Sequence, residues 1–153
     1  TYFYRVAKDF VIQGGNTDLE ITQSKRSAIG KYAIPHEIQP LKLYHKRCAL
    51  CAAREWQNNP EKMSDVYNFS IVQAVKMHKL HLDKLDRERE WKIPANQRAK
   101  YTSSGGAPHL DGEHTVFGEL YEGLDVLKKI ADVEVDAVEW PKVDIVMQVE
   151  VIE

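Results

Sequence analysis

Two polar side chains stand inside apolar runs near the start of the chain, and both could contact a ligand. Arg5 lies within the run Tyr2–Val6, and Gln13 ends the run Phe10–Gln13 that follows after residues 7–9. Aromatic and β-branched runs separated by such a break predict two short strands joined by a turn. A half-buried guanidinium must find acceptors, so Arg5 either forms a structural ion pair or points at a ligand.

A second stretch completes a longer pattern. Residues 3–6 have the form aromatic-x-Arg-Val, residues 9–15 read Asp-Phe-x-Ile-Gln-Gly-Gly, and residues 110–118 read Leu-Asp-Gly-x-His-x-Val-Phe-Gly. Together, and in this order, these stretches resemble the cyclophilin-type peptidyl-prolyl cis-trans isomerases. Since each motif is long and their order matches, the resemblance favours a ligand-directed role for Arg5 over a structural ion pair.

The resemblance implies a mainly β fold: a closed antiparallel β-barrel capped by helices. We expect one cyclophilin-like domain over residues 1–153, with a helical insertion over residues 73–106. The family's pattern also has a strand pair and a helix before the aromatic-x-Arg strand, and these are absent from this chain. Their absence would leave an open barrel edge, unless the chain is part of a longer one or another segment supplies the strands.

The implied chemistry is rotation about X-Pro peptide bonds. This reaction requires no nucleophile, metal or cofactor, but it requires an apolar slot for the proline ring and a donor that favours the twisted amide. By resemblance, Arg5 is that donor and Gln13 orients it; both are the expected catalytic residues. The resemblance assigns substrate binding to seven further residues: Phe10, Val11, Asn68, Ser70, His109, Leu110 and His114.

Several of these positions depart from the family pattern. Ser70 replaces a pocket phenylalanine, Asn68 replaces a longer glutamine, and Arg54 replaces an asparagine that usually contacts the substrate backbone. Loss of the aromatic wall at position 70 would weaken proline binding if nothing refills the space. His109 stands where many members have a tryptophan that contacts cyclosporin, so we expect weak or no cyclosporin binding.

The expected partners are proline-containing polypeptides, and we expect a monomeric isomerase that assists protein folding. The remodelled pocket leaves an alternative open: a proline-peptide binding module or chaperone without catalysis. The insertion resembles those of some bacterial cyclophilins that act in the cell envelope, which suggests a periplasmic or envelope location. The net charge of −2 and the lack of a dense basic run argue against nucleic-acid binding. No apolar stretch approaches the ~20 residues that a membrane span requires.

Two short motifs could suggest other chemistry. Cys48 and Cys51 form a Cys-x-x-Cys pair, but they lie in a predicted buried strand, in which residues three apart point to opposite faces. We therefore expect unpaired thiols. His78 and His81 have the spacing of a metal pair, yet no third ligand can be identified, so we expect solvent-facing histidines and no metal site.

Periodicity predicts the elements that position these residues. Further strands are expected at Tyr32–Ile34, Cys48–Arg54, Val66–Val72, Thr115–Leu120 and Asp144–Ile152, and helices at Gln73–Trp91, Pro94–Tyr101 and Leu124–Ala131. In the last strand, Ile145, Met147, Val149 and Val151 alternate with polar residues and should face the core. Residues 16–31 are expected to form a long loop, and residues 103–106 a flexible hinge.

Overall fold

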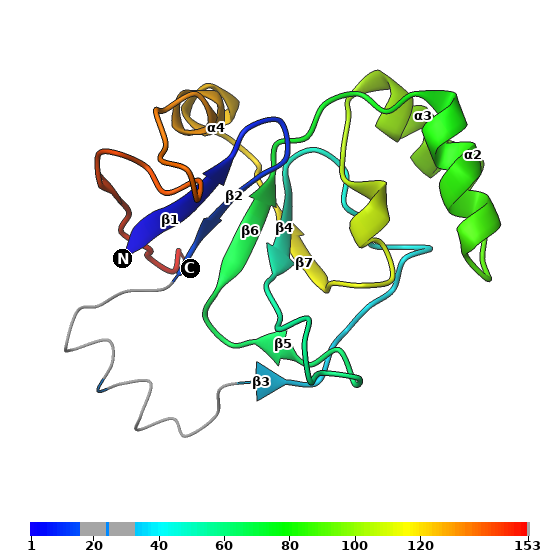
Figure 1. Cartoon of the computed structure of the whole chain (residues 1–153), viewed down its shortest axis with the longest axis horizontal. Helices are drawn as coiled ribbons and strands as arrows, with labels where there is room; N and C mark the ends of the chain where they lie inside the picture. The colour runs from blue at the N-terminus through cyan, green and yellow to red at the C-terminus, as the bar shows by residue number, and fades with distance from the viewer. Residues whose placement is uncertain (16–23, 25–32, 153) are drawn as a thin grey trace.

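A computed structural model describes residues 1–15, 24 and 33–152; the loop expected over residues 16–31 lies almost wholly outside these residues. An antiparallel sheet of six strands, in the order β7-β4-β6-β2-β1-β8, forms the centre of the molecule (Figure 1). Its strands are β1 (Tyr2–Ala7), β2 (Val11–Gly14), β4 (Ala49–Ala52), β6 (Phe69–Val72), β7 (Val116–Glu119) and β8 (Ile145–Val146). A separate two-stranded sheet pairs β3 (Ala33–Ile34) with β5 (Ser64–Asp65).

The expected closed barrel is not confirmed. Within the described residues, β7 pairs only with β4 and β8 pairs only with β1, so the six-stranded sheet has two open edges. Closure of a barrel requires a hydrogen-bonded ladder between the first and last strands, and here these strands lie at opposite ends of the order. The mainly β class is confirmed, and closure into a barrel is not confirmed by the described residues.

The last strand is much shorter than the alternation predicts. The strand covers only Ile145–Val146, followed by one further backbone pair between Met147 and Thr1 (2.9 and 3.2 Å), and Val149 and Val151 are exposed instead of facing the core. Ile145 and Met147 do pack against the core cluster that contains Phe3 and Ile12. The alternating pattern therefore continues past the point where the chain has a neighbouring strand to bind.

The hairpin of β1 and β2 forms where the sequence predicts it. Asp9 adopts a left-handed conformation (φ 59°), which its short polar side chain tolerates, and the Phe10 amide donates to the Ala7 carbonyl (3.1 Å). This turn sets a register in which Ala7 pairs with Val11 and Arg5 pairs with Gln13. The two polar side chains therefore lie directly opposite each other on one face of the sheet.

Hydrophobic clusters cover both faces of the sheet. On one face, α4 (Leu124–Ala131) packs Leu127 and Ala131 against Phe3, Val6 and Ile12. Its apolar stripe and its C-terminal lysines agree with the predicted helix. The cluster on the other face contains Val11, Cys51, Val72, Ala107 and Val116, with Phe10 and Leu110 packed against it.

The inserted segment forms two helices, as predicted, but they are of similar length and not one long and one short. The first, α2 (Lys79–Glu88), is shorter than the predicted Gln73–Trp91, because His78 accepts a hydrogen bond from the Leu80 amide and so caps its start. The second, α3 (Ala95–Ser103), follows Pro94. The two helices enclose a small core of Leu82, Ile93 and Tyr101.

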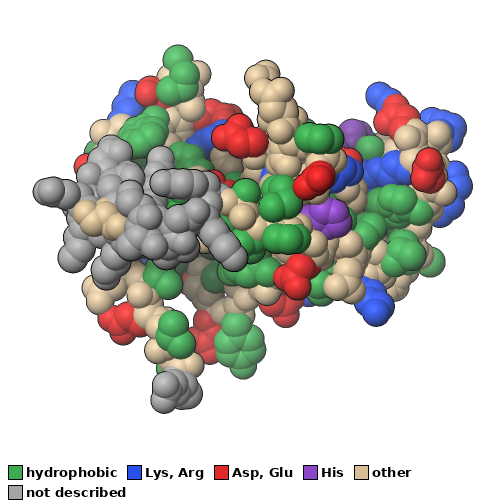
Figure 2. All heavy atoms as spheres, turned by 90° about the horizontal axis from the view of Figure 1, so that it is seen from below, with side chains coloured by type: hydrophobic (Ala, Val, Ile, Leu, Met, Phe, Trp, Pro, Cys, Tyr) green, Lys and Arg blue, Asp and Glu red, His purple; other side chains and the backbone are tan. Residues whose placement is uncertain are grey.

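The exposed face of α2 is charged, as predicted. Figure 2 shows Lys, Arg, Asp and Glu side chains gathered at the end of the molecule that α2 forms. Lys84 pairs with Glu88 one turn later (3.7 Å), while Arg98 of α3 pairs with Asp83 and with Asp86 (2.6 Å for the latter). None of the helices in the described residues is long and apolar enough to span a membrane.

Candidate functional site

A row of side chains crosses four neighbouring strands in register. Arg5 of β1 lies opposite Gln13 of β2, Gln13 lies opposite Ser70 of β6, and Ser70 lies opposite Cys51 of β4. Directly opposed residues in an antiparallel sheet share a face, so these four side chains form one line across the sheet. Three of the four are polar, which is unusual for the face of a sheet that also carries a hydrophobic core.

This row forms the floor of a cavity of about 290 Å³. Ten residues line the cavity: Arg5, Phe10, Val11, Gln13, Cys51, Trp56, Ser70, His109, Leu110 and His114. The structure thus brings together all of the predicted site residues except Asn68. The guanidinium of Arg5 opens onto the cavity, which contains both apolar walls and hydrogen-bonding groups.

Arg5 is held by two partners. Its Nε and Nη2 both lie 2.7 Å from Glu139 Oε2, and its Nη1 donates to Gln13 Oε1 (2.7 Å). Gln13 Nε2 in turn donates to Ser70 Oγ (3.2 Å). These contacts use three of the five N–H donors of a guanidinium, as far as the described residues show. The side chain of Arg5 is 35% exposed, so it is fixed and still accessible.

The apolar walls come from the β1–β2 turn and from the short helix η1 (Pro108–Leu110). The ring of Phe10 lies 5.2 Å from that of His109, tilted by 33°. Burial lowers the pKa of His109. Because Phe10 and Leu110 also pack on the buried cluster beneath the cavity, the walls are fixed to the core.

His114 forms a further wall. Its Nδ1–H donates to the Ala52 carbonyl oxygen (3.2 Å). Burial lowers the pKa of His114 to about 4; the nearby His45 and Arg54 act in the same direction, whereas the hydrogen bond to Ala52 acts against it. At neutral pH the ring is therefore uncharged and can contact apolar groups.

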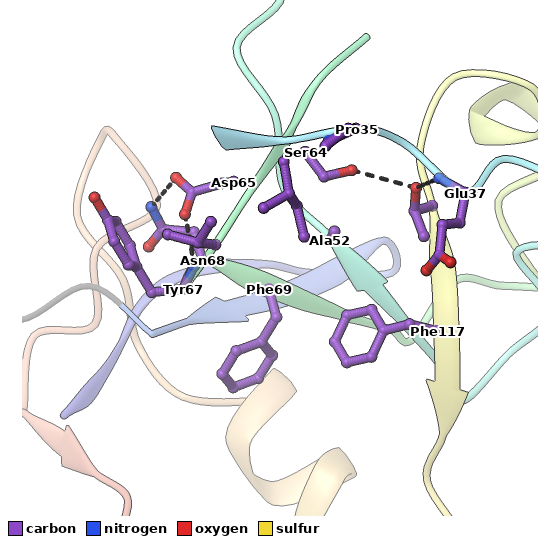
Figure 3. Close-up of a pocket in the computed structure, with 12 residues that line it drawn as sticks. Pro35, Glu37, Ala52, Ser64, Asp65, Tyr67, Asn68, Phe69 and Phe117 are labelled. Atoms are coloured by element: carbon purple, nitrogen blue, oxygen red, sulfur yellow. Dashed lines mark hydrogen bonds between the residues drawn. The ribbon is translucent and has the colours of Figure 1, made fainter. Parts of the chain in front are cut away.

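Asn68 lies in a different cavity, away from the other predicted site residues. This second cavity, of about 410 Å³, lies beside β5 and includes Asn68, Phe69 and Phe117 (Figure 3). Asn68 Nδ2 donates to Asp65 Oδ2 (2.8 Å), and its backbone amide donates to Asp65 Oδ1 (2.9 Å). The turn that starts at Asp65 therefore fixes the amide away from Arg5.

Sequence reasoning missed two residues at the predicted site and placed a third differently from the structure. Trp56 lines the cavity from the polar segment after β4, where a lone tryptophan is the only signal that the sequence offers. Glu139 holds Arg5 from 134 positions away, and no local pattern indicates this pair. Arg54, expected near the substrate, does not line the cavity; it donates to the Glu113 carbonyl (2.7 Å) and carboxylate (2.8 Å).

The Cys-x-x-Cys pair and His78 form no disulfide or metal cluster in the described part of the chain. Cys48 and Cys51 are free, as expected. Burial raises the pKa of the Cys51 thiol, so the group that lines the cavity is a thiol and not a thiolate nucleophile. His78 serves as a helix cap, and the described residues contain no cluster of three or more potential metal ligands.

The family model for cyclophilin-type peptidyl-prolyl cis-trans isomerase/CLD matches residues 1–151. The chain belongs to this cyclophilin family. A Streptococcus pyogenes protein named "Putative bifunctional phosphatase/peptidyl-prolyl cis-trans isomerase" is 35% identical over 149 residues, which are 95% of this chain and 29% of that protein. A Staphylococcus epidermidis protein named "Putative peptidyl-prolyl cis-trans isomerase" is 33% identical over 146 residues, or 95% of this cyclophilin and 68% of the relative.

Solved structures agree on the fold. A Cryptosporidium parvum cyclophilin-type peptidyl-prolyl cis-trans isomerase superposes with a TM-score of 0.61 at 20% identity, over 95% of this cyclophilin and 68% of that chain. A second structure of the same protein, determined in the presence of the dipeptide Ala-Pro, gives a TM-score of 0.59 at 20% identity, over 94% and 68%. The cyclophilin fold is therefore common to both, although the sheet described here is open.

Proposed function

We propose that this cyclophilin catalyses cis–trans isomerisation of X-Pro peptide bonds in polypeptides. The observation that carries the proposal is the position of the Arg5 guanidinium: it opens onto a cavity with apolar walls while two partners hold it. The named activity of the relatives and the use of Ala-Pro with the Cryptosporidium protein support the same substrate class.

To accelerate the reaction, the protein needs only to bind the twisted amide more tightly than the planar amide. Rotation about the X-Pro bond is slow because amide resonance must be lost, at a cost of about 20 kcal/mol. As the amide twists, the imide nitrogen regains a lone pair and can accept a hydrogen bond. A guanidinium N–H fixed beside the proline ring would stabilise that state more than the planar one. No covalent step and no cofactor enter this scheme.

Each contact of Arg5 has a role in the scheme. Glu139 and Gln13 contact three of the guanidinium nitrogens, and among the described residues two N–H groups remain for a substrate. The hydrogen bond from Gln13 to Ser70 requires the amide oxygen of Gln13 to face Arg5. Fixed in this way, the guanidinium needs little reorganisation when the substrate amide twists, and this favours catalysis.

The test combines turnover with binding on one substrate. Exchange spectroscopy by NMR measures the isomerisation rate of an Ala-Pro peptide, and a titration measures its affinity. We expect Arg5→Ala to reduce turnover by at least a hundredfold, in line with the loss of one fixed donor to a transition state. Peptide affinity should change by less than about tenfold, because the apolar walls remain.

Arg87→Ala is the matched control, since Arg87 is an exposed arginine on α2 outside the cavity. It should retain full turnover. Peptide binding without any rate enhancement by the unaltered protein would overturn the proposal and favour the alternative, a proline-peptide binding module. Full turnover by Arg5→Ala would leave isomerisation in place but remove Arg5 from it.

A further inference from the structure

We propose that Trp56 determines specificity for the proline ring, because its indole provides the aromatic wall that strand β6 lacks. This inference rests on the proposed function, since it concerns the same cavity and substrate. Trp56 lines the cavity together with Arg5 and Ser70, and it comes from the segment that follows β4. Nothing in its local sequence pattern requires an aromatic residue there.

Position 70 cannot supply the wall itself. Ser70 is buried in the floor of the cavity, and its hydroxyl accepts the hydrogen bond from Gln13. A serine at this position thus takes part in the series of hydrogen bonds that links Ser70, Gln13 and Arg5. Its small side chain leaves space in the cavity above the sheet. A proline ring that enters the cavity needs an apolar surface to pack against, and the indole is the largest aromatic side chain that lines it.

The indole is held in place although it is exposed. The guanidinium of Arg54 lies 4.1 Å from the centroid of the indole ring, within the range of a cation–π interaction. The side chain of Arg54 is only 5% exposed and is bound to Glu113, which also pairs with Lys62 (2.8 Å). The support of Trp56 is therefore itself fixed by a network of ion pairs.

A second ring also packs against Trp56. The His114 ring lies 5.1 Å from it at 67°, an edge-to-face arrangement. Trp56 nevertheless remains 61% exposed, so most of its surface stays available. A large aromatic surface that is ordered before the ligand arrives can bind it with little loss of side-chain entropy, which is the arrangement expected of a binding residue.

The test isolates the contact with the ring. Two peptides that differ only in having proline or N-methylalanine share the same tertiary amide, but only the first has a ring. Their affinity ratio, measured by NMR titration, reports how much the protein gains from the ring. We expect Trp56→Ala to reduce this ratio about fivefold or more, and Trp56→Phe to retain most of it.

Two controls separate this effect from misfolding. Tyr121→Ala removes an exposed aromatic residue that does not line the cavity and should leave the ratio unchanged. In the unaltered protein, the indole N–H signal of Trp56, assigned by its loss in Trp56→Phe, should shift on addition of an Ala-Pro peptide. The signal of Trp91, which lies in the insertion, should shift much less.

An unchanged ratio in Trp56→Ala, with a stationary Trp56 signal, would overturn this inference. It would leave the proposed function intact if Arg5→Ala still abolishes turnover. Conversely, absence of turnover in the unaltered protein would reject the isomerase, while the ring preference and its loss in Trp56→Ala could still be measured, because both are binding quantities.

Discussion

At the scale of single residues, the partners of Arg5 matter as much as Arg5 itself. Glu139 accepts a hydrogen bond from its Nε and forms an ion pair with its Nη2, and Gln13 accepts a hydrogen bond from its Nη1. Glu139 reaches this position from a turn whose backbone carbonyl also accepts from the Val6 amide (2.8 Å). Both contacts tie the turn to β1, so we infer that Glu139 is a positioning residue for the guanidinium.

Removal of this carboxylate tests that role. We expect Glu139→Ala to lower kcat about fivefold with little change in KM, because the guanidinium loses its anchor but the apolar walls are unaltered. The NMR signal of the Arg5 Nε–H should also move, which a general loss of stability would not cause. Glu134→Ala is the control: Glu134 pairs with Lys142 (3.0 Å) at the surface, away from the cavity.

A rise in kcat for Glu139→Ala would contradict this role. It would mean that the carboxylate competes with the substrate for the guanidinium and so opposes catalysis. An unchanged Arg5 Nε–H signal would show that Gln13 alone is enough to fix the side chain.

His114 predicts a pH dependence of stability. Its pKa is lowered from the ordinary 6.5 to about 4 in the folded state, chiefly by burial. As the pH falls, the unfolded chain binds a proton at His114 before the folded chain does. Stability is therefore lost as the pH falls from about 6.5 to about 4, and the loss due to this group ends below that value.

Urea unfolding at pH 7 and at pH 4.5 measures this loss. Because His114 is partly exposed, we expect its contribution to be about 2 kcal/mol, less than burial in a dry interior would give. His114→Asn retains a donor for the Ala52 carbonyl and should lose less stability between the two pH values. His36→Asn, at an exposed position, should behave as the unaltered protein. Equal losses in all three proteins would refute the assignment to His114.

At the scale of elements, the sequence patterns predicted correctly those helices and strands whose position depends on contacts between residues close in the chain. The β1–β2 hairpin and α4 lie where the sequence predicts them, because each is fixed by a turn or by one apolar stripe. The prediction of a C-terminal strand over Asp144–Ile152 is wrong beyond Val146, because a strand forms only where a neighbouring strand is present to pair with it. Periodicity does not contain that information.

The same distinction applies to the site. The motif around Arg5 and Gln13 predicted the residues that the sheet register brings together. It does not predict that Asn68 lies in another cavity, where a hydrogen bond to Asp65 three residues earlier holds its side chain. Glu139 and Trp56 reach the site from loops, and tertiary contacts alone define their positions.

Residues 103–106, expected to form a flexible hinge, instead include a glycine that packs closely against neighbouring elements. Gly106 is buried, and its amide donates a hydrogen bond to the Val75 carbonyl (3.3 Å). Its backbone also forms an isolated antiparallel β-bridge with that of Lys46. A Cβ at this position would lie 2.5 Å from the His45 carbonyl oxygen and 2.5 Å from the Tyr101 ring. The glycine therefore permits a close approach of the insertion to the sheet.

We expect Gly106→Ala to destabilise the protein by about 3 kcal/mol, because backbone and a buried ring must both move. Gly118→Ala on β7 is the matched control. A Cβ there would lie 3.4 Å from Leu50 Cδ2, an ordinary contact, and should change stability by less than about 1 kcal/mol. Urea unfolding of both variants measures the difference, and similar stabilities would refute the packing argument.

At the scale of the whole molecule, the insertion is connected to the cavity by buried polar contacts. Tyr101 of α3 donates to Asp111 Oδ2 (2.5 Å), and Asp111 Oδ1 accepts from the backbone amide of His45 (2.8 Å). Arg89, just after α2, donates to the Pro108 carbonyl (2.6 Å). These contacts hold η1, which carries two of the cavity walls, so the insertion should influence substrate binding without contacting the substrate.

Leu82 and Leu80 on the same helix test this coupling. Leu82 is fully buried in the small core of the insertion, whereas Leu80 is 69% exposed. We expect Leu82→Ala to lower the stability of α2 and α3 by about 3 kcal/mol, and Leu80→Ala by less than about 0.5 kcal/mol. Hydrogen exchange should accelerate in both helices of Leu82→Ala and should remain slow in β2, β4 and β6, which have a separate core.

The effect on function follows from the contacts at η1. If the insertion holds η1 in place, Leu82→Ala should raise KM for an Ala-Pro peptide several-fold and leave kcat nearly unchanged, because the partners of Arg5 lie outside the insertion. Leu80→Ala should change neither constant. Faster exchange in α2 and α3 without any change in KM would show that η1 is held by the sheet alone, and that the insertion is a separate unit with respect to the site.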